Sequence, residues 1–191
     1  MNKVIGTTTL YGSAKEPRLL SSLRMIEDAV GLGYKVVVVD ESPEEVKKAL
    51  TNSGASVFPG NNSGMGAGRR QAIRLAADLA GKEGVIFWME PEKYPLVPFM
   101  QQISQPIISG EADLIVVGRK SLDSFPTTQQ MSERVGNLVY DLMTGRPYDF
   151  YMGPRAFRPE AAKFFIDYQG EYGDLWESIY IPIIRAIRSG L

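Results

Sequence analysis

The chain has 191 residues, a net charge of −1, no cysteine and no histidine. This length favours one domain with a full-sized core, and the near-zero charge provides no field to attract nucleic acid or an anionic membrane. Disulfides and thiolate metal sites are excluded, and the commonest general base is missing. No apolar run could cross a bilayer, and the N-terminus lacks the apolar centre of a signal peptide. We therefore expect a cytoplasmic protein without a membrane span.

Strands and helices alternate along the chain. Runs of β-branched residues indicate strands, and apolar residues three and four positions apart indicate helices. Ser42 and Asp174 each have a Glu three residues later, which predicts a capping box at two helix starts. The predicted strands cover 3–10, 34–40, 55–58, 85–88 and 113–117; the predicted helices cover 18–30, 69–80 and 132–143, with others opening at Ser42 and Asp174.

This alternation predicts an α/β fold with a Rossmann-like, mainly parallel central sheet and helices on both faces. The continuous valines of 36–39 are typical of a strand that is buried on both faces. In such folds, ligands bind beyond the carboxyl ends of the strands. Residues that directly follow a strand are therefore the first candidates for a functional site.

A glycine-rich segment over 62–70 precedes and opens a predicted helix. Its sequence is Asn-Ser-Gly-Met-Gly-Ala-Gly-Arg-Arg, with three glycines at alternate positions. Glycine lets a backbone approach a ligand closely, and the N-terminus of a helix favours an anion. Arg69 and Arg70 add charges that can pair with phosphate oxygens. The segment lacks the glycine spacing of a Rossmann fingerprint and the Gly-Lys-Ser/Thr of a Walker loop; a flexible turn is the alternative interpretation.

Acidic residues follow two of the predicted strands. Asp40 ends the valine strand, where its carboxylate could accept hydrogen bonds from a base or ribose, or serve only as a loop acid. Glu90 and Glu92 follow the strand 85–88 on either side of a proline. Two carboxylates at this spacing could share a divalent cation through their oxygens. Their alternative role is that of solvated loop acids.

The order of these segments resembles the family 2 glycosyltransferases and the related polyprenol-phosphate and glycerate-type sugar transferases, which have the GT-A fold. The family pattern has an acid after the second strand, then Asn-x-Gly-x-Gly-x-Ala-Arg-Asn, then Asp-x-Asp at a strand end. The matching residues are Asp40 at the first site, Asn62, Gly64, Gly66 and Arg69 at the second, and Glu90-Pro91-Glu92 at the third.

The resemblance continues downstream. The stretch 112–120 is similar to the family's Ala-Asp-Leu-Val-x-Gly-Ser-Arg, and Thr144, Gly145, Asp149, Gly153 and Arg155 resemble its Thr-Gly…Asp…Gly-x-Arg stretch, which borders the acceptor site. The resemblance implies a single GT-A-like nucleotide-sugar-binding domain over 1–191, with a donor half over about 1–120 and an acceptor half over about 121–191. Family members commonly continue beyond the last helix, so we expect a minimal or trimmed version.

The same resemblance implies roles for individual residues. The base and ribose of the donor lie near Thr8 and Asp40, and Asp149 lies near the acceptor. Arg119 points toward the diphosphate or the sugar. Glu90 and Glu92 face the diphosphate and its cation, Mg²⁺ or Mn²⁺. The residues expected to contact the donor are Thr8, Asp40, Asn62, Gly64, Gly66, Arg69, Glu90 and Arg119.

Inversion at the sugar needs a carboxylate that takes the proton of the acceptor hydroxyl. In a chain without histidine the candidates are Asp149, Asp174 and Glu177. Each has a structural alternative, as a turn residue, an N-cap or a capping-box partner respectively. Both metal positions carry Glu where the family has Asp, and the family's late histidine ligand is absent. Lys93 and the arginines are therefore the alternative to a cation.

We expect a glycosyltransferase that moves a sugar from a nucleoside diphosphate to the hydroxyl of a small or lipid-linked acceptor. One alternative is a nucleotidyltransferase, although its glycine-rich loop would follow the first strand, where 10–14 holds a single glycine. Another is a catalytically inactive GT-A-like binding or assembly module, favoured by Glu-Pro-Glu and the missing histidine. Aromatic residues are frequent in the C-terminal third. Core packing accounts for most of these side chains, and a homodimer surface is the expected role of some others.

Overall fold

The computed structural model describes residues 1–61 and 63–191. Six strands form one sheet in the order β3-β2-β1-β4-β6-β5. Strands β1 to β4 are parallel, whereas β6 is antiparallel to both of its neighbours, β4 and β5. The mainly parallel sheet is thus confirmed, and β6 is an addition that the sequence pattern did not predict. The strands are β1 (Lys3–Thr9), β2 (Lys35–Asp40), β3 (Ser56–Pro59), β4 (Val85–Trp88), β5 (Leu114–Val116) and β6 (Arg155–Phe157).

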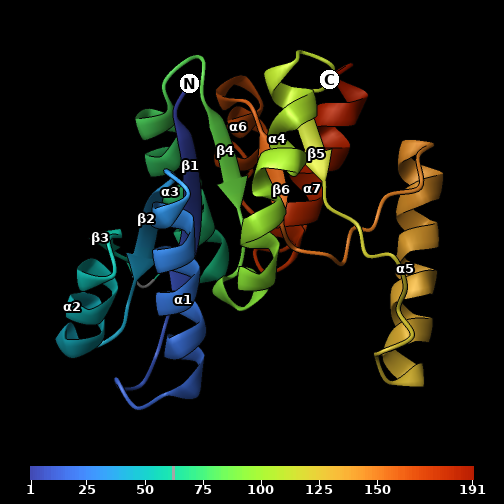
Figure 1. Cartoon of the computed structure of the whole chain (residues 1–191). Coiled ribbons are helices and arrows are strands. Elements are labelled where there is room, and N and C mark those ends of the chain that lie inside the picture. The colour runs from blue at the N-terminus through green and yellow to red at the C-terminus, as the bar shows by residue number, and fades with distance from the viewer. Residues whose placement is uncertain (62) are drawn as a thin grey trace.

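Helices cover both faces of the sheet (Figure 1). Residues of α1, α2, η1 and α4 join one apolar cluster, and residues of α3, α6 and α7 join a second cluster on the other face. The described helices are α1 (Pro17–Gly31), α2 (Glu44–Asn52), α3 (Met65–Ala80), the 3₁₀ helix η1 (Pro91–Phe99), α4 (Met100–Ile108), α5 (Thr127–Thr144), α6 (Pro159–Ile166) and α7 (Glu177–Arg188).

The valines of β2 show how the sequence builds these two layers. Val36 and Val38 belong to the cluster under α1, and Val37 and Val39 belong to the cluster under α3. Successive side chains of a strand point to opposite faces, so an unbroken apolar run is what a strand covered on both sides needs. Each such side chain contributes roughly 1.5–3 kcal/mol through its burial.

The starts of helices α2 and α7 differ from the two predicted capping boxes. Helix α2 begins at Glu44 without a side-chain cap, because the Ser42 hydroxyl donates to Asp40 Oδ1 at 2.6 Å instead. Helix α7 begins at Glu177 rather than at Asp174. The Asp174 carboxylate accepts two hydrogen bonds from Arg70, at 2.5 and 2.9 Å. The two expected cap residues, Ser42 and Asp174, therefore bind Asp40 and Arg70 instead of capping a helix.

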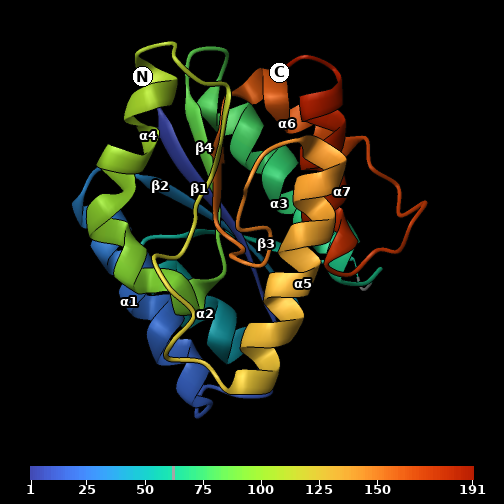
Figure 2. The ribbon, with the colours of Figure 1, turned by 90° about the vertical axis from the view of Figure 1, so that its right-hand side faces the viewer.

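Helix α5 stands apart from the sheet. Figure 1 shows it beside the body of the molecule, joined by two extended segments, and Figure 2 looks onto it where it runs along α7. Its first turn starts five residues before the predicted helix, at Thr127. None of the helices in the described residues is both long enough and apolar enough to cross a membrane.

Candidate functional site

A cavity of about 240 Å³ lies at the carboxyl ends of β1 and β2. This is the sheet edge at which Rossmann-like folds bind ligands. Complete small-molecule sites have roughly 300–1,000 Å³, so this cavity fits one ring system of a larger ligand. Two predicted donor-binding residues, Thr8 and Gly64, are brought together here. The lining residues are Thr8, Thr9, Leu10, Val39, Glu41, Gly64, Met65 and Gly68.

Asp40 stands between two residues that line this cavity, Val39 and Glu41. Its own buried carboxylate forms hydrogen bonds within the protein. Oδ1 accepts hydrogen bonds from Thr9 Oγ1 and Ser42 Oγ, both at 2.6 Å, and Oδ2 accepts one from the Ser42 N–H at 3.0 Å. Ser42 Oγ in turn accepts from the Tyr11 N–H at 2.8 Å. Asp40 thus fixes the loop after β2, and Glu41 is the acid that lines the cavity.

The glycine-rich segment lies close to a distant part of the chain. Asn62 is outside the described residues. Gly64 lines the cavity with a φ of 91°, a conformation that side-chain-bearing residues rarely adopt. Gly66 donates its N–H to the Asp174 carbonyl oxygen at 3.0 Å, and a Cβ at this position would overlap the Asp174 carboxylate. A protein carboxylate therefore occupies part of the anion-favouring N-terminus of α3.

The two arginines of this segment contact the chain before and within α7. Arg69 is buried, and its Nη1 donates to the Leu175 carbonyl oxygen at 2.6 Å and to Ser178 Oγ at 3.0 Å. Its guanidinium lies 4.7 Å from the ring centroid of Trp176. Burial lowers the pKa of Arg69. Arg69 thus links α3 to α7. Arg70 links α3 to the segment before α7 through its ion pair with Asp174.

Glu90 and Glu92 interact with different parts of the chain after β4. The Glu90 carboxylate lies against Gly153, where a Cβ would overlap it. Glu92 is exposed and interacts electrostatically with Tyr11 and Arg18. Across the described ranges, no three potential metal-ligating side chains come together. A cation shared by the two glutamates alone stays a prediction.

The Glu90 carboxylate belongs to a group of side chains with buried polar atoms, which we call the Glu90 cluster: Arg69, Trp88, Glu90 and Arg155. Within the described part of the chain, both Glu90 oxygens, Trp88 Nε1 and the Nε atoms of both arginines are buried without a hydrogen-bond partner. Burial lowers the pKa of Arg155 to about 10, and the charge of Glu90 opposes this shift. Unpartnered buried polar atoms are costly, so the cluster is a place where a polar ligand or ordered water would complete the hydrogen bonding.

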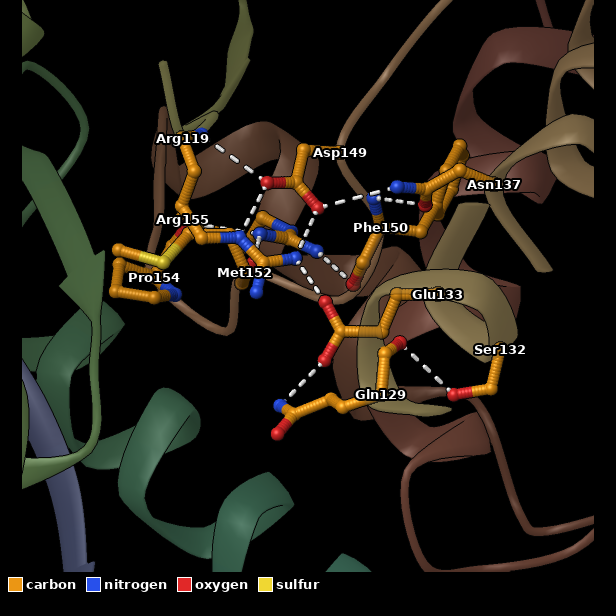
Figure 3. A network of polar contacts seen from close by, with 10 residues as sticks. All are labelled: Arg119, Gln129, Ser132, Glu133, Asn137, Asp149, Phe150, Met152, Pro154 and Arg155. Atoms are coloured by element: carbon orange, nitrogen blue, oxygen red, sulfur yellow. Dashed lines mark hydrogen bonds and ion pairs between the residues drawn. The ribbon is translucent and has the colours of Figure 1, made fainter. Parts of the chain in front are cut away.

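Arg119 and Asp149, both expected near the substrates, bind each other (Figure 3). Arg119 Nε donates to Asp149 Oδ2 and Nη2 donates to Oδ1, both at 2.7 Å, and the Arg119 N–H donates to Oδ2 at 3.0 Å. Burial by itself would raise the pKa of Asp149, but the donors of Arg119, its charge and Asn137 together lower it. A carboxylate held in this way is a weak base.

Helix α5 supplies two further members of this network. Glu133 pairs with Arg119 Nη2 at 2.6 Å. Asn137 donates to Asp149 Oδ1 at 3.3 Å and accepts from the Phe150 N–H at 3.0 Å. The sequence analysis did not single out Glu133 or Asn137. Their spacing of four residues, which places them on one helix face, is the signal that could have found them.

Glu177, the other candidate base, is the first residue of α7. Its Oε2 accepts a hydrogen bond from the Leu175 N–H at 3.1 Å. A Cβ at Gly173 would be 2.9 Å from the Glu177 carboxyl carbon, so that glycine makes room for the side chain. Glu177 therefore orders the turn that precedes α7, which resembles the expected capping role.

The sheet order and the helices on both faces define a Rossmann-like α/β protein. No family model matches the sequence, and no curated protein matches it. The chain is similar to a solved structure titled "Crystal Structure of a Mycobacterial Protein", with a TM-score of 0.58 and 13% sequence identity. The match covers 84% of this chain and 54% of that protein, so this chain spans about half of its length. At this identity the likeness is one of fold.

Proposed function

We propose that the chain is a GT-A-type glycosyltransferase that binds the nucleoside of a nucleotide-sugar donor in the cavity at the ends of β1 and β2. The position and lining of this cavity carry the proposal. Leu10, Val39 and Met65 offer apolar contact to a base ring, and the hydroxyl of Thr8 and the carboxylate of Glu41 offer hydrogen bonds to base or ribose.

The Glu90 cluster is the proposed place of transfer. The bond from the anomeric carbon to the leaving diphosphate breaks, and a bond to the acceptor oxygen forms. Negative charge then grows on the diphosphate, and fixed cations such as Arg155 and Arg69 can stabilise it. Glu90, whose oxygens are without hydrogen-bond partners in the described residues, would take the acceptor's proton in place of Asp149.

A second candidate, a binding module without turnover, is favoured by specific contacts. Asp174 covers part of the N-terminus of α3, and Arg69 is directed to α7 rather than to the cavity. Arg119 occupies both oxygens of Asp149. In this case the chain retains the nucleoside cavity, while the groups that the transferases use for chemistry serve the fold.

One pair of assays separates these functions. Thermal unfolding is measured with UDP, GDP, ADP and CDP and their sugar conjugates, with and without Mg²⁺, because a ligand of the native state raises the midpoint. Release of nucleoside diphosphate from the stabilising sugar conjugate is then measured. Stabilisation with release supports the transferase, and stabilisation without release supports the binding module. The absence of any stabilisation contradicts both.

A further inference from the structure

Helix α5 presents an apolar stripe on the side facing away from the sheet. Four residues at spacings of four, three and four form this α5 stripe: Met131, Val135, Leu138 and Leu142, which are 64, 63, 58 and 79% exposed. This spacing is that of the core positions of a helix that packs along another helix. Within the described residues, nothing covers the stripe.

The opposite face of α5 is firmly attached. Glu133 pairs with Arg119, and Tyr140, seven residues later on the same face, stacks on Phe150 with ring centroids 4.5 Å apart. A Cβ at Gly136 would overlap the Tyr151 ring, so this glycine lets the aromatic side chain lie against the helix. These contacts hold the helix so that its apolar stripe is directed outward.

We propose that the α5 stripe binds a second copy of this chain, with the two α5 helices antiparallel about a two-fold axis. In this register Met131 packs against the partner's Leu142, and Val135 packs against the partner's Leu138. The sum of the paired residue numbers is the same for both contacts, which a two-fold axis between antiparallel helices requires.

Charged residues beside the α5 stripe favour a second copy of this chain as its partner. Arg134 and Asp141 lie seven residues apart on one flank of the stripe. Arg134 is exposed, and the half-buried Asp141 accepts a hydrogen bond at Oδ1, from the Tyr148 N–H at 3.2 Å. In the antiparallel register, these flanking positions of the two helices face each other. Arg134 then faces the partner's Asp141, and Asp141 faces the partner's Arg134, so the flank is complementary to itself. A lipid surface would offer no such match for Asp141.

The test is the oligomeric state in solution, by analytical ultracentrifugation over a wide range of concentration. We expect a weak dimer, because two paired helices form a small interface. Leu138→Glu should give a monomer, whereas Leu20→Glu, at a similarly exposed leucine on α1, should leave the dimer intact. Thermal unfolding and circular dichroism verify that each variant is folded.

A charge exchange tests the antiparallel register. Arg134→Asp and Asp141→Arg alone should each weaken the dimer about tenfold, because each substitution acts twice across the axis, and the double exchange should restore it. A wild-type monomer at all concentrations overturns the proposal. Cosedimentation of a wild-type monomer with phosphatidylglycerol vesicles would also overturn the proposal, if Leu138→Glu abolishes this vesicle binding. A dimer that none of these variants changes places the interface elsewhere.

Discussion

The Arg119 guanidinium and the Asp149 carboxylate meet edge to edge, with Nε–Oδ2 and Nη2–Oδ1 distances both of 2.7 Å. Arg119 follows β5 and Asp149 precedes β6. The pair therefore joins the two ends of the connection between β5 and β6, which contains α5. It also uses the lone pairs that a catalytic base would need. The arrangement favours a structural role for Asp149.

Asp149→Ala should lower the free energy of unfolding by about 2–3 kcal/mol. Removing one partner of a fully buried ion pair costs about 3–5 kcal/mol, and here the side chains of Arg119 and Asp149 keep 14% and 15% exposure. Asp28→Ala is the matched control, because its pair with Arg24 is exposed and should contribute about 0.5 kcal/mol. Urea unfolding at neutral pH measures both. Equal losses in the two variants would contradict the structural role.

The contribution of Asp149 should depend on pH in one direction. Its pKa is lowered in the folded chain relative to about 3.9 in an unfolded one. The stabilisation is therefore fully present above about pH 4–5 and is lost as the pH falls through the folded pKa. Urea unfolding of the wild type and Asp149→Ala should give curves that converge below about pH 4. A difference that stays constant down to acid unfolding would show that charge on Asp149 is irrelevant.

Gly66→Ala should destabilise the chain by about 1–3 kcal/mol, because the added Cβ would overlap the Asp174 carboxylate and force it away from Arg70. Gly31→Ala is the control: it lies at the end of α1 with no atom within 4 Å of an added Cβ. Thermal unfolding of both variants measures the effect. If Gly66→Ala were as stable as Gly31→Ala, the contact between α3 and the segment before α7 would be unimportant.

Glu90→Gln should abolish turnover and leave nucleoside binding intact, because the substitution removes a proton acceptor from the Glu90 cluster but leaves the cavity unchanged. The control is Glu92→Gln, at an exposed residue that interacts electrostatically with Tyr11 and Arg18. Product release and calorimetric titration with nucleotide measure the two properties. Similar loss of turnover in both variants, reversed by added Mg²⁺, would favour a shared cation site instead.

Local patterns were sufficient for five of the six strands in the described sheet and for the edge at which the cavity lies, but not for β6. They were not sufficient for Arg69 and Arg70, because their partners lie more than 100 residues away in the sequence. An arginine can pair with a phosphate or with the carboxylate and carbonyl groups of a distant segment, and the local sequence does not decide between these partners.

The choice between Asp40 and Glu41 illustrates a rule that could have been applied. Val36 and Val38 face α1, so Asp40, two residues further, is expected on that face. Val39 and Glu41 both line the cavity, on the α3 face of the sheet. Alternation along the strand therefore favours Glu41 over Asp40 as the acid directed into the cavity. A resemblance in residue order did not carry this information.

The measurement closest to the central claim is calorimetric titration of nucleoside diphosphates into the wild type and Gly68→Leu. Gly68 lines the cavity, and an added Cβ would lie at ordinary contact distance, 3.5 Å, from Thr8 Cγ2, so a leucine should fit the backbone and fill the cavity. We expect the wild type to bind a nucleotide, Gly68→Leu to lose at least about tenfold in affinity, and Gly31→Leu to bind as the wild type does. Equal binding by Gly68→Leu and the wild type, or no binding by the wild type, would contradict the account.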